Sequence, residues 1–173
     1  MRLGLGLALL AGMMTAVPAI PAAAAPVGAA PPARARALVL KPLTLTRIQD
    51  LDFGTVMTSS SPGMVVINAT SGARTTSGGV TGLPSAVGQR ARFAGAGTPG
   101  QQVFILLVPP AVLTNSVSGD TIDVLAMSLD GSPIRTINST RAFFVGVGGV
   151  IAVAADQADG LYSAEFEIYA DYQ

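Results

Sequence analysis

The 173-residue sequence contains no cysteine, no histidine and no tryptophan. Without cysteine, no disulfide can stabilise the fold, so stability must come from side-chain packing and strand pairing. Without imidazole and thiol groups, Ser-His-Asp and Cys-His nucleophile systems and the usual zinc ligand sets are excluded. Without tryptophan, a carbohydrate-stacking platform is a weaker hypothesis than a core role for most aromatic rings. We therefore expect no enzyme, no catalytic residue, no metal site and no cofactor.

Charged residues are also scarce, at 12% of the chain, with ten Lys or Arg balanced by ten Asp or Glu. Because the basic residues are scattered, no electrostatic surface for nucleic acid is expected. Half of the residues are hydrophobic, which argues against a disordered chain, while 20 Gly and 12 Pro argue against a helical bundle. The composition predicts a single β-rich domain.

The first 24 residues have the pattern of a signal peptide. A basic start at Arg2 precedes an apolar run over residues 3–17, and small residues continue as far as Ala25. The run is shorter than the roughly 20 residues that span a bilayer, and Pro18 ends it, so we do not expect a membrane anchor. We predict cleavage after Ala24, with a later cut after Ala29 as the alternative, and no integral membrane segment in the mature chain. The expected location is the periplasm, the cell surface or the extracellular space.

Residues 25–36 are rich in Pro and Ala and predict an extended N-terminal arm. Arg34 and Arg36 alternate with alanines in this arm. Two interpretations stay open: the arm is a basic segment for a partner's acidic groove, or the arginines only keep an extended tail soluble.

Residues 37–173 are expected to form an all-β, immunoglobulin-like antiparallel β-sandwich of about seven to nine strands. Apolar and β-prone runs recur between turn residues and no helical period appears. Pro42 predicts an edge position or a break in the first run. The predicted strands cover residues 37–46, 50–56, 64–69, 89–94, 101–108, 121–129, 141–153 and 161–173.

The last of these segments has the clearest pattern, a period of two held from residue 161 to 173. We expect Glu165 and Glu167 to face solvent and the alternate residues to face the core, namely Tyr162, Phe166, Ile168 and Tyr172. A chain that stops on a core strand leaves no following strand to cover its free edge, which predicts that something else covers it.

Two motifs resemble one family. The segment L-D-F-G-T at residues 51–55 and the segment D-Q-A-D-G-L-Y at residues 156–162 resemble the bacterial "domain of unknown function 4402" family, with Asp156 standing where Asn is expected. The resemblance covers most of the mature chain. It implies a pilin-like or spore-coat-U-like exported β-sandwich, and the Tyr172-Gln173 ending is similar to that of fimbrial subunits.

No candidate site residue is nominated. The pairs Asp50 with Asp52 and Glu165 with Glu167 are close carboxylates on one strand face, but a solvated polar face accounts for them. The glycines at 146, 148 and 149 lack the strand-to-helix context of a phosphate loop and predict a bulge or close backbone approach. The sequons at Asn68 and Asn138 are expected to have no glycosylation role.

Two functions from different classes remain. The first is a structural or adhesive surface subunit, fimbria-like or coat-like, that self-assembles through a donated β-strand, with the arm as donor. A periplasmic chaperone and an outer-membrane usher would then be partners. The alternative is a self-complete, monomeric secreted module of a matrix or ligand-binding kind. An envelope enzyme with paired carboxylates is a third hypothesis, which would require two buried acids in one pocket.

Overall fold

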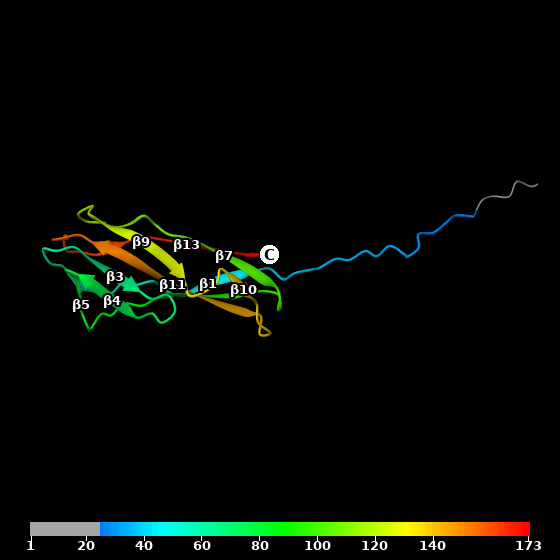
Figure 1. Ribbon diagram of the computed structural model, residues 1–173, viewed down its shortest axis with the longest axis horizontal. Coiled ribbons are helices and arrows are strands. Elements are labelled where there is room, and N and C mark those ends of the chain that lie inside the picture. The colour runs from blue at the N-terminus through cyan, green and yellow to red at the C-terminus, as the bar shows by residue number, and fades with distance from the viewer. Residues whose placement is uncertain (1–24) are drawn as a thin grey trace, which may run out of the picture. The chain divides into compact units, whose positions relative to one another are not determined.

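The computed structural model of the protein describes residues 25–173, and the predicted signal peptide lies outside them. The chain divides into two units, Met1–Leu38 and Val39–Gln173. The described part of the first unit, residues 25–38, is exposed and has no regular secondary structure. The second unit carries every strand drawn in Figure 1. No helix occurs in residues 25–173, and hence none that is long and apolar enough to cross a membrane.

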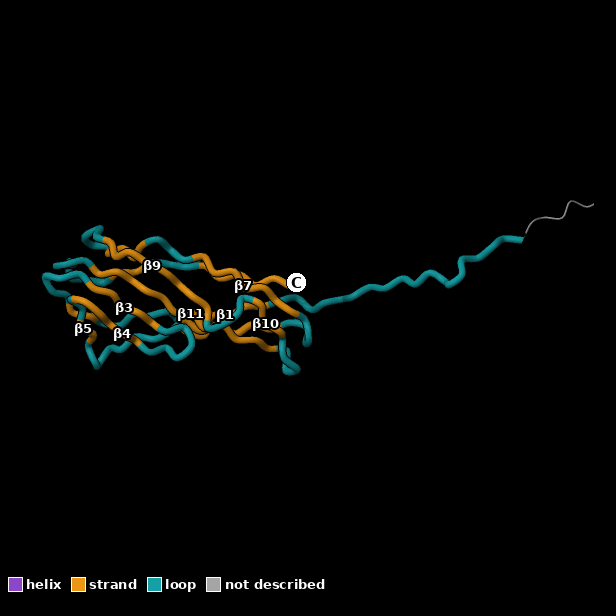
Figure 2. The backbone as a smooth tube through the Cα atoms, viewed as in Figure 1, coloured by secondary structure: helices purple, strands orange, loops and turns teal. Residues whose placement is uncertain are grey.

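Thirteen strands occur among the described residues, nine of them with four or more residues (Figure 2). They are β1 (Thr44–Gln49), β2 (Val56–Met57), β3 (Gly63–Ile67), β4 (Arg74–Gly78), β5 (Thr81–Gly82), β6 (Ala91–Ala96), β7 (Gln102–Val108), β8 (Val112–Asn115), β9 (Thr121–Leu129), β10 (Ile134–Thr136), β11 (Ala142–Val153), β12 (Tyr162–Ser163) and β13 (Glu167–Tyr172). All strand pairs are antiparallel, so the predicted all-β antiparallel class is confirmed.

The long strand β11 organises the large sheet, whose order is β1-β6-β11-β9-β8-β12. One edge of β11 pairs with β6 through residues 142–147 and then with β3 through residues 149–153. Its other edge pairs with β9 through residues 147–152. Because two strands share one edge of β11 in succession, the sheet curls around its inner face. Two smaller sheets have the orders β10-β7-β13 and β2-β5.

Two buried clusters lie along the inner face of β11. The first cluster packs strands of the large sheet against the three-stranded sheet, and its buried members are Ala91, Phe93, Val103, Ile105, Ile137, Phe143, Val145 and Val147. The second cluster lies further along β11, and its buried members are Val65, Val80, Ile122, Ile151 and Val153. The inward side chains of β11 therefore contribute to both clusters, and alternation along this strand sets the register of the core.

The glycines of β11 allow the backbone of a neighbouring segment to approach closely. A Cβ at Gly148 would collide with the carbonyl oxygen of Ile67, and one at Gly146 would crowd the carbonyl oxygen of Ala69. The ladder between β11 and β9 also shifts register between Val150 and Ile151. Of the two predicted roles of these glycines, close backbone approach is confirmed. The bulge lies elsewhere, at Leu125 of β9, which has no partner opposite the Val150–Ile151 step.

The prediction of one strand over residues 161–173 is wrong, although the alternation is right. Tyr162 packs on the second cluster, while Phe166 and Tyr172 pack on the first, and Glu165 and Glu167 are exposed. Residues 164–166 break the strand, so that β12 pairs with β8 in the large sheet and β13 pairs with β7 in the small one. The chain passes from one sheet to the other here, yet the even-numbered side chains face the core both before and after the break. The alternation of the sequence therefore does not reveal the change of sheet.

Two other predicted strands also differ from the structure. The first strand begins at Thr44 rather than at residue 37, because Pro42 has no N–H to donate to a ladder. Residues 50–56 form only an isolated bridge between Asp52 and Gln89 before β2 begins. Gly54, with φ +73°, turns the chain there.

Four strands were not predicted: β4, β5, β8 and β10. They are short, and the sequence of β4, R-T-T-S-G, has no apolar alternation. Such strands are specified by the neighbours with which they pair, here β3 for β4, and not by their own residues.

Two adjacent phenylalanines of β11 test this packing. Phe143 is 4% exposed and its ring covers Gly95, whereas Phe144 is 56% exposed. We predict that Phe143→Ala costs about 3–5 kcal/mol of unfolding free energy, as large core truncations do. Phe144→Ala should cost less than about 1 kcal/mol. Chemical denaturation of both variants decides this, and equal losses would contradict the assigned register of β11.

Candidate functional site: a groove above the second core cluster

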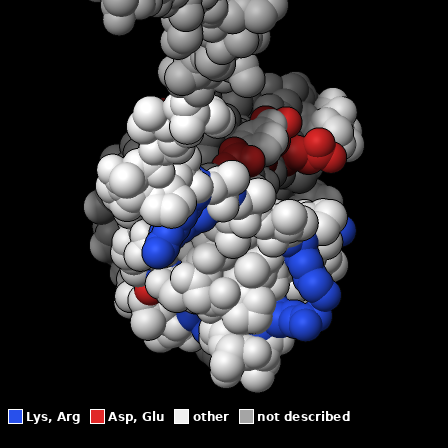
Figure 3. Space-filling view, turned by 90° about the vertical axis from the view of Figure 1, so that its right-hand side faces the viewer, with Lys and Arg blue, Asp and Glu red and all other residues white. Residues whose placement is uncertain are grey.

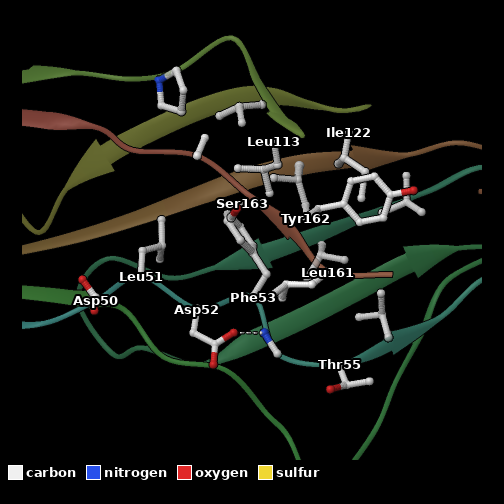
Figure 4. Close-up of a pocket in the computed structure, with 18 of the residues that line it drawn as sticks. Asp50, Leu51, Asp52, Phe53, Thr55, Leu113, Ile122, Leu161, Tyr162 and Ser163 are labelled. Carbon is white, nitrogen blue, oxygen red and sulfur yellow. Dashed lines mark hydrogen bonds between the residues drawn. The ribbon is translucent and has the colours of Figure 1, made fainter. Parts of the chain in front are cut away.

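A cavity of about 1060 Å³ opens above the second buried cluster (Figure 4). Residues 50–58 form one wall and residues 157–166 form the other. We call this cavity the groove. Its floor is apolar and is formed by Val65, Leu113, Ile122, Val124, Ile151 and Val153. Figure 4 shows Leu51, Asp52 and Phe53 on one side and Tyr162 and Ser163 on the other.

The groove exists because the two core clusters are covered unequally. The first cluster includes side chains from β7 and β13 of the three-stranded sheet. The second cluster contains no residue of that sheet and is flanked instead by Phe53, Val56, Leu113, Val124 and Tyr162. The first cluster is thus covered by the three-stranded sheet. The second cluster is covered instead by the loop around Phe53 and by the two-residue strand β2. The apolar floor is left only partly covered.

The first wall is built by the L-D-F-G-T segment. The Asp52 carboxylate accepts a hydrogen bond from the Gly54 N–H at 2.7 Å, which closes a tight turn. The Asp52 backbone exchanges two hydrogen bonds with Gln89, and Phe53 packs against the second cluster. A Cβ at Gly54 would collide with the Ala86 carbonyl oxygen. Only glycine therefore fits this turn, both in backbone angle and in space.

Arg74 of β4 fixes this wall in place. Its guanidinium donates to the carbonyl oxygens of Phe53, Thr55 and Ala86 at 3.3, 3.0 and 2.7 Å, and to that of Leu83 at 2.8 Å. A planar guanidinium presents several donors in fixed directions, so one side chain can satisfy carbonyls from two loops. The sequence analysis missed this role, because an arginine in a polar strand carries no pattern that singles it out.

The second wall is built by the D-Q-A-D-G-L-Y segment. The Tyr162 hydroxyl donates to the Ala158 carbonyl oxygen at 2.7 Å and accepts from the Gln157 amide at 3.0 Å. The same Gln157 amide donates to the Thr121 carbonyl oxygen at 3.2 Å, which ties the segment to β9. Asp156 has φ +49°, a left-handed conformation that Asn tolerates best after Gly. This explains why Asn is expected at this position.

Two further sets of hydrogen bonds join segments that are distant in sequence, one beside the groove and one at the C-terminal end of β13. Near the groove, the Asp156 N–H donates to the Ser59 carbonyl oxygen at 2.9 Å and so joins the two walls. At the far end of β13, the Tyr172 hydroxyl donates to the Lys41 carbonyl oxygen at 2.8 Å and accepts from the Thr98 N–H at 2.8 Å. Lys41, just before β1, is thus held beside the C-terminal end of β13.

The backbone of the second wall is incompletely paired. Residues 164–166 belong to neither β12 nor β13, and no backbone hydrogen bond joins them to another of the described residues outside the strand ladders. Within the same part of the chain, β13 pairs only with β7 and β1 only with β6. Unpaired backbone beside an apolar groove is a template for an additional strand.

Acidic side chains are the main charges along the walls. Asp50, Asp52, Asp159 and Glu165 line the groove, and all are exposed. Arg47, the only lining Lys or Arg among the described residues, is paired with Asp50 at 2.7 Å. On the face of the molecule drawn in Figure 3, charged side chains form small separate groups among largely uncharged ones. The two predicted carboxylate pairs lie on exposed faces, and the buried acids that the enzyme hypothesis requires are not found in residues 25–173.

The other predicted polar positions act in local structure. Asn68 and Asn138 accept backbone hydrogen bonds from Thr70 and Thr140, two residues on, as turn residues do. Tyr169 donates to Glu167 at 2.6 Å, and this hydrogen bond and the nearby charge raise the pKa of Tyr169. Within residues 25–173, no three acidic side chains are grouped as a metal ion would require.

These features define an all-β protein with antiparallel sheets and one solvent-accessible apolar groove. A comparison with family models agrees with the resemblance noted from the motifs. The chain belongs to the family described as domain of unknown function (DUF4402), whose model matches residues 43–172. The matched region includes both walls of the groove. No curated protein matches the chain, and no solved structure matches it.

Arg74 offers a test of how the groove is held open. We predict that Arg74→Met lowers the unfolding free energy by about 2–3 kcal/mol, because partly buried carbonyls lose charged donors. Amide hydrogen exchange at Thr55 and Leu83, whose N–H groups bond within this wall, should also accelerate. The control is Arg92→Met, at an exposed arginine without a side-chain hydrogen bond to the described residues, which should change stability by less than about 0.5 kcal/mol. Unchanged exchange in Arg74→Met would show that the wall is held otherwise.

Proposed function

We propose that the protein is an exported structural subunit of a bacterial surface that assembles by accepting a β-strand into the groove. The single observation that carries the proposal is the apolar groove whose second wall has unpaired backbone at residues 164–166. In strand addition, main-chain hydrogen bonds provide affinity and alternate side chains fill pockets. The groove offers unpaired backbone at residues 164–166 beside an apolar floor that could accept side chains.

The proposed architecture is an incomplete immunoglobulin-like sandwich of the pilin kind. The three-stranded sheet covers the first core cluster and leaves the second without a strand above it. One added strand between the two walls would complete the layer and bury the floor. Burial of apolar area at about 25 cal/mol per Å² would favour such an occupant.

The proposal also includes export of the protein from the cytoplasm. The signal-peptide pattern of residues 1–24 supports passage out of the cytoplasm, to the periplasm, the cell surface or beyond. An unfilled groove is also an aggregation hazard before assembly. A periplasmic chaperone and an outer-membrane usher are therefore proposed partners, because a subunit of this kind needs its groove protected in transit.

The second candidate is a monomeric secreted module that binds a ligand in the groove. The observation in its favour is size, because about 1060 Å³ is slightly more than the roughly 300–1,000 Å³ usual for small-molecule pockets, and therefore enough for such a ligand. An adhesive or matrix role would fit the same exported module. The two functions predict different oligomeric states.

A bulky residue in the second wall separates these functions. Ala164 is exposed and lines the groove, whereas Ala126 of β9 is exposed and does not line it. For the chain comprising residues 25–173, light scattering after size exclusion should show oligomers that grow with concentration. Ala164→Trp should reduce them about tenfold, equivalent to roughly 1.4 kcal/mol of association free energy. The control Ala126→Trp should assemble like the unaltered chain.

The outcomes discriminate directly. A chain that stays monomeric at every concentration would contradict the structural subunit and favour the ligand-binding module. Equal assembly of the Ala164→Trp and Ala126→Trp variants, with melting temperatures unchanged, would show that assembly does not use the groove.

A further inference from the structure

We infer that the outer face of the three-stranded sheet is an interaction surface on which two copies of this chain pair face to face. The surface consists of the outward side chains of β10, β7 and β13, and we call it the outer face. It lies on the side of the sheet away from the first core cluster, and none of its side chains lines the groove. The inference is therefore independent of strand addition.

The central strand of this sheet is apolar on both sides. The sequence of β7 is Q-V-F-I-L-L-V, and successive side chains of a strand point to opposite faces. Val103 and Ile105 are buried in the first core cluster, whereas Phe104, Leu106 and Val108 are exposed on the outer face. A strand with one solvated side alternates apolar and polar residues, and a continuous apolar run is typical of a strand covered on both sides. The sequence of β7 therefore indicates that a partner covers its outward side.

The neighbouring strands extend the apolar surface of β7. Ile134 of β10 is directly opposite Phe104, and Tyr169 of β13 is directly opposite Leu106. Side chains that stand opposite each other on one face of antiparallel strands are close enough to touch. Ile134 and Tyr169 are also exposed. Together these side chains form one continuous surface, which we call the apolar patch: Phe104, Leu106, Val108, Ile134 and Tyr169.

The area of the apolar patch is sufficient for a dimer. Its five side chains are between 39% and 49% exposed, which leaves roughly 400 Å² of apolar surface in contact with water. Two such patches in contact would bury roughly 800 Å², which corresponds to about 1,200 Å² in total at the apolar fraction of about 65% in homodimer interfaces. Stable interfaces begin at about 1,200 Å².

The charges of the outer face lie on one side of the apolar patch. Glu167 and Asp171 of β13 point outward beside the patch and are exposed. Arg135, the remaining charged residue of these three strands, points inward and pairs with Asp130 at 2.6 Å. The Tyr169 hydroxyl donates to Glu167, so its ring can be covered while the hydroxyl keeps a partner. An uncharged centre with a charged border is typical of protein interfaces, whereas two carboxylates beside the patch oppose binding to an anionic lipid surface.

A two-fold axis parallel to β7 accommodates both the apolar patch and these charges. Sheets that pack face to face keep their strands within about 30° of each other and lie about 10 Å apart. Under this axis, β7 of one copy lies over β7 of the second, and β13 of each copy lies over β10 of the other. Glu167 and Asp171 of the two copies then lie at opposite borders of the interface, so like charges do not face each other. An isologous contact of this kind closes at two copies.

Cross-linking at a single position tests the two-fold contact without background, because the chain has no cysteine. Leu106 is near the middle of β7, so a two-fold axis brings it close to Leu106 of the second copy. The variant Leu106→Cys, in the chain of residues 25–173 with Ala164→Trp to suppress strand addition, is treated with a short bismaleimide. We expect a covalent dimer on denaturing electrophoresis. The control is Leu125→Cys, at an exposed leucine of β9 outside the outer face, which should give at most a trace.

A covalent dimer from Leu106→Cys and not from Leu125→Cys supports the inference. No dimer from Leu106→Cys would overturn it, because a contact between unlike surfaces does not bring a residue against its own copy. Equal yields from both variants would indicate chance encounters and would overturn it as well. Each of these failures leaves the proposed function in place, since strand addition is suppressed in both variants.

A polar substitution tests the apolar contact without a cross-linker. In the Ala164→Trp chain, sedimentation equilibrium should show monomers and dimers, and Leu106→Thr should weaken dimerisation about tenfold. Threonine suits an exposed strand position, so the melting temperature should stay nearly unchanged. The control Leu125→Thr should dimerise like its parent chain.

Dimerisation that is unchanged in Leu106→Thr would overturn the inference. A monomer that binds phosphatidylcholine vesicles, and loses this binding in Leu106→Thr, would overturn it too, because a lipid surface would then be the occupant of the apolar patch.

Discussion

The rest of the structure depends on the inner face of β11. Its alternating side chains, from Phe143 to Val153, contribute to both core clusters, and its two edges hold β6, β3 and β9. Gly146 and Gly148 let neighbouring backbone pass where any side chain would collide. With β6 and β3 sharing one edge in succession, the large sheet curls. The small sheet can then cover only one of the two clusters.

This unequal covering explains why the groove is held open by polar contacts and not by sheet pairing. The first wall is fixed by the guanidinium of Arg74, which donates hydrogen bonds to four carbonyl oxygens. The second wall is fixed by hydrogen bonds of the Tyr162 hydroxyl and the Gln157 amide. Such contacts fix the spacing of the walls without filling the space between them. The two motifs on which the family resemblance rested are the segments that build these walls.

Features that depend on the alternation of apolar and polar residues could be predicted from the sequence. Features that depend on which strands pair with each other could not. The parity of residues 161–173 follows from a period-two pattern and is confirmed. The strand over residues 121–129 is confirmed as well. The exchange of sheets at residues 164–166 could not be predicted, because parity is the same on both sides of the break. Arg74 was missed since its partners are backbone carbonyls remote in sequence. The acidic lining of the groove was also missed, because Asp50 and Glu165 line one cavity only in the folded chain.

The central claim is that the second wall of the groove lacks a strand that a neighbouring subunit supplies. Amide hydrogen exchange at residues 164–166, compared between dissociated and assembled protein, tests it most directly. These amides have no backbone partner among the described residues, so they should exchange rapidly in the monomer and become protected on assembly. Slow exchange in both states, or rapid exchange in both, would contradict the account.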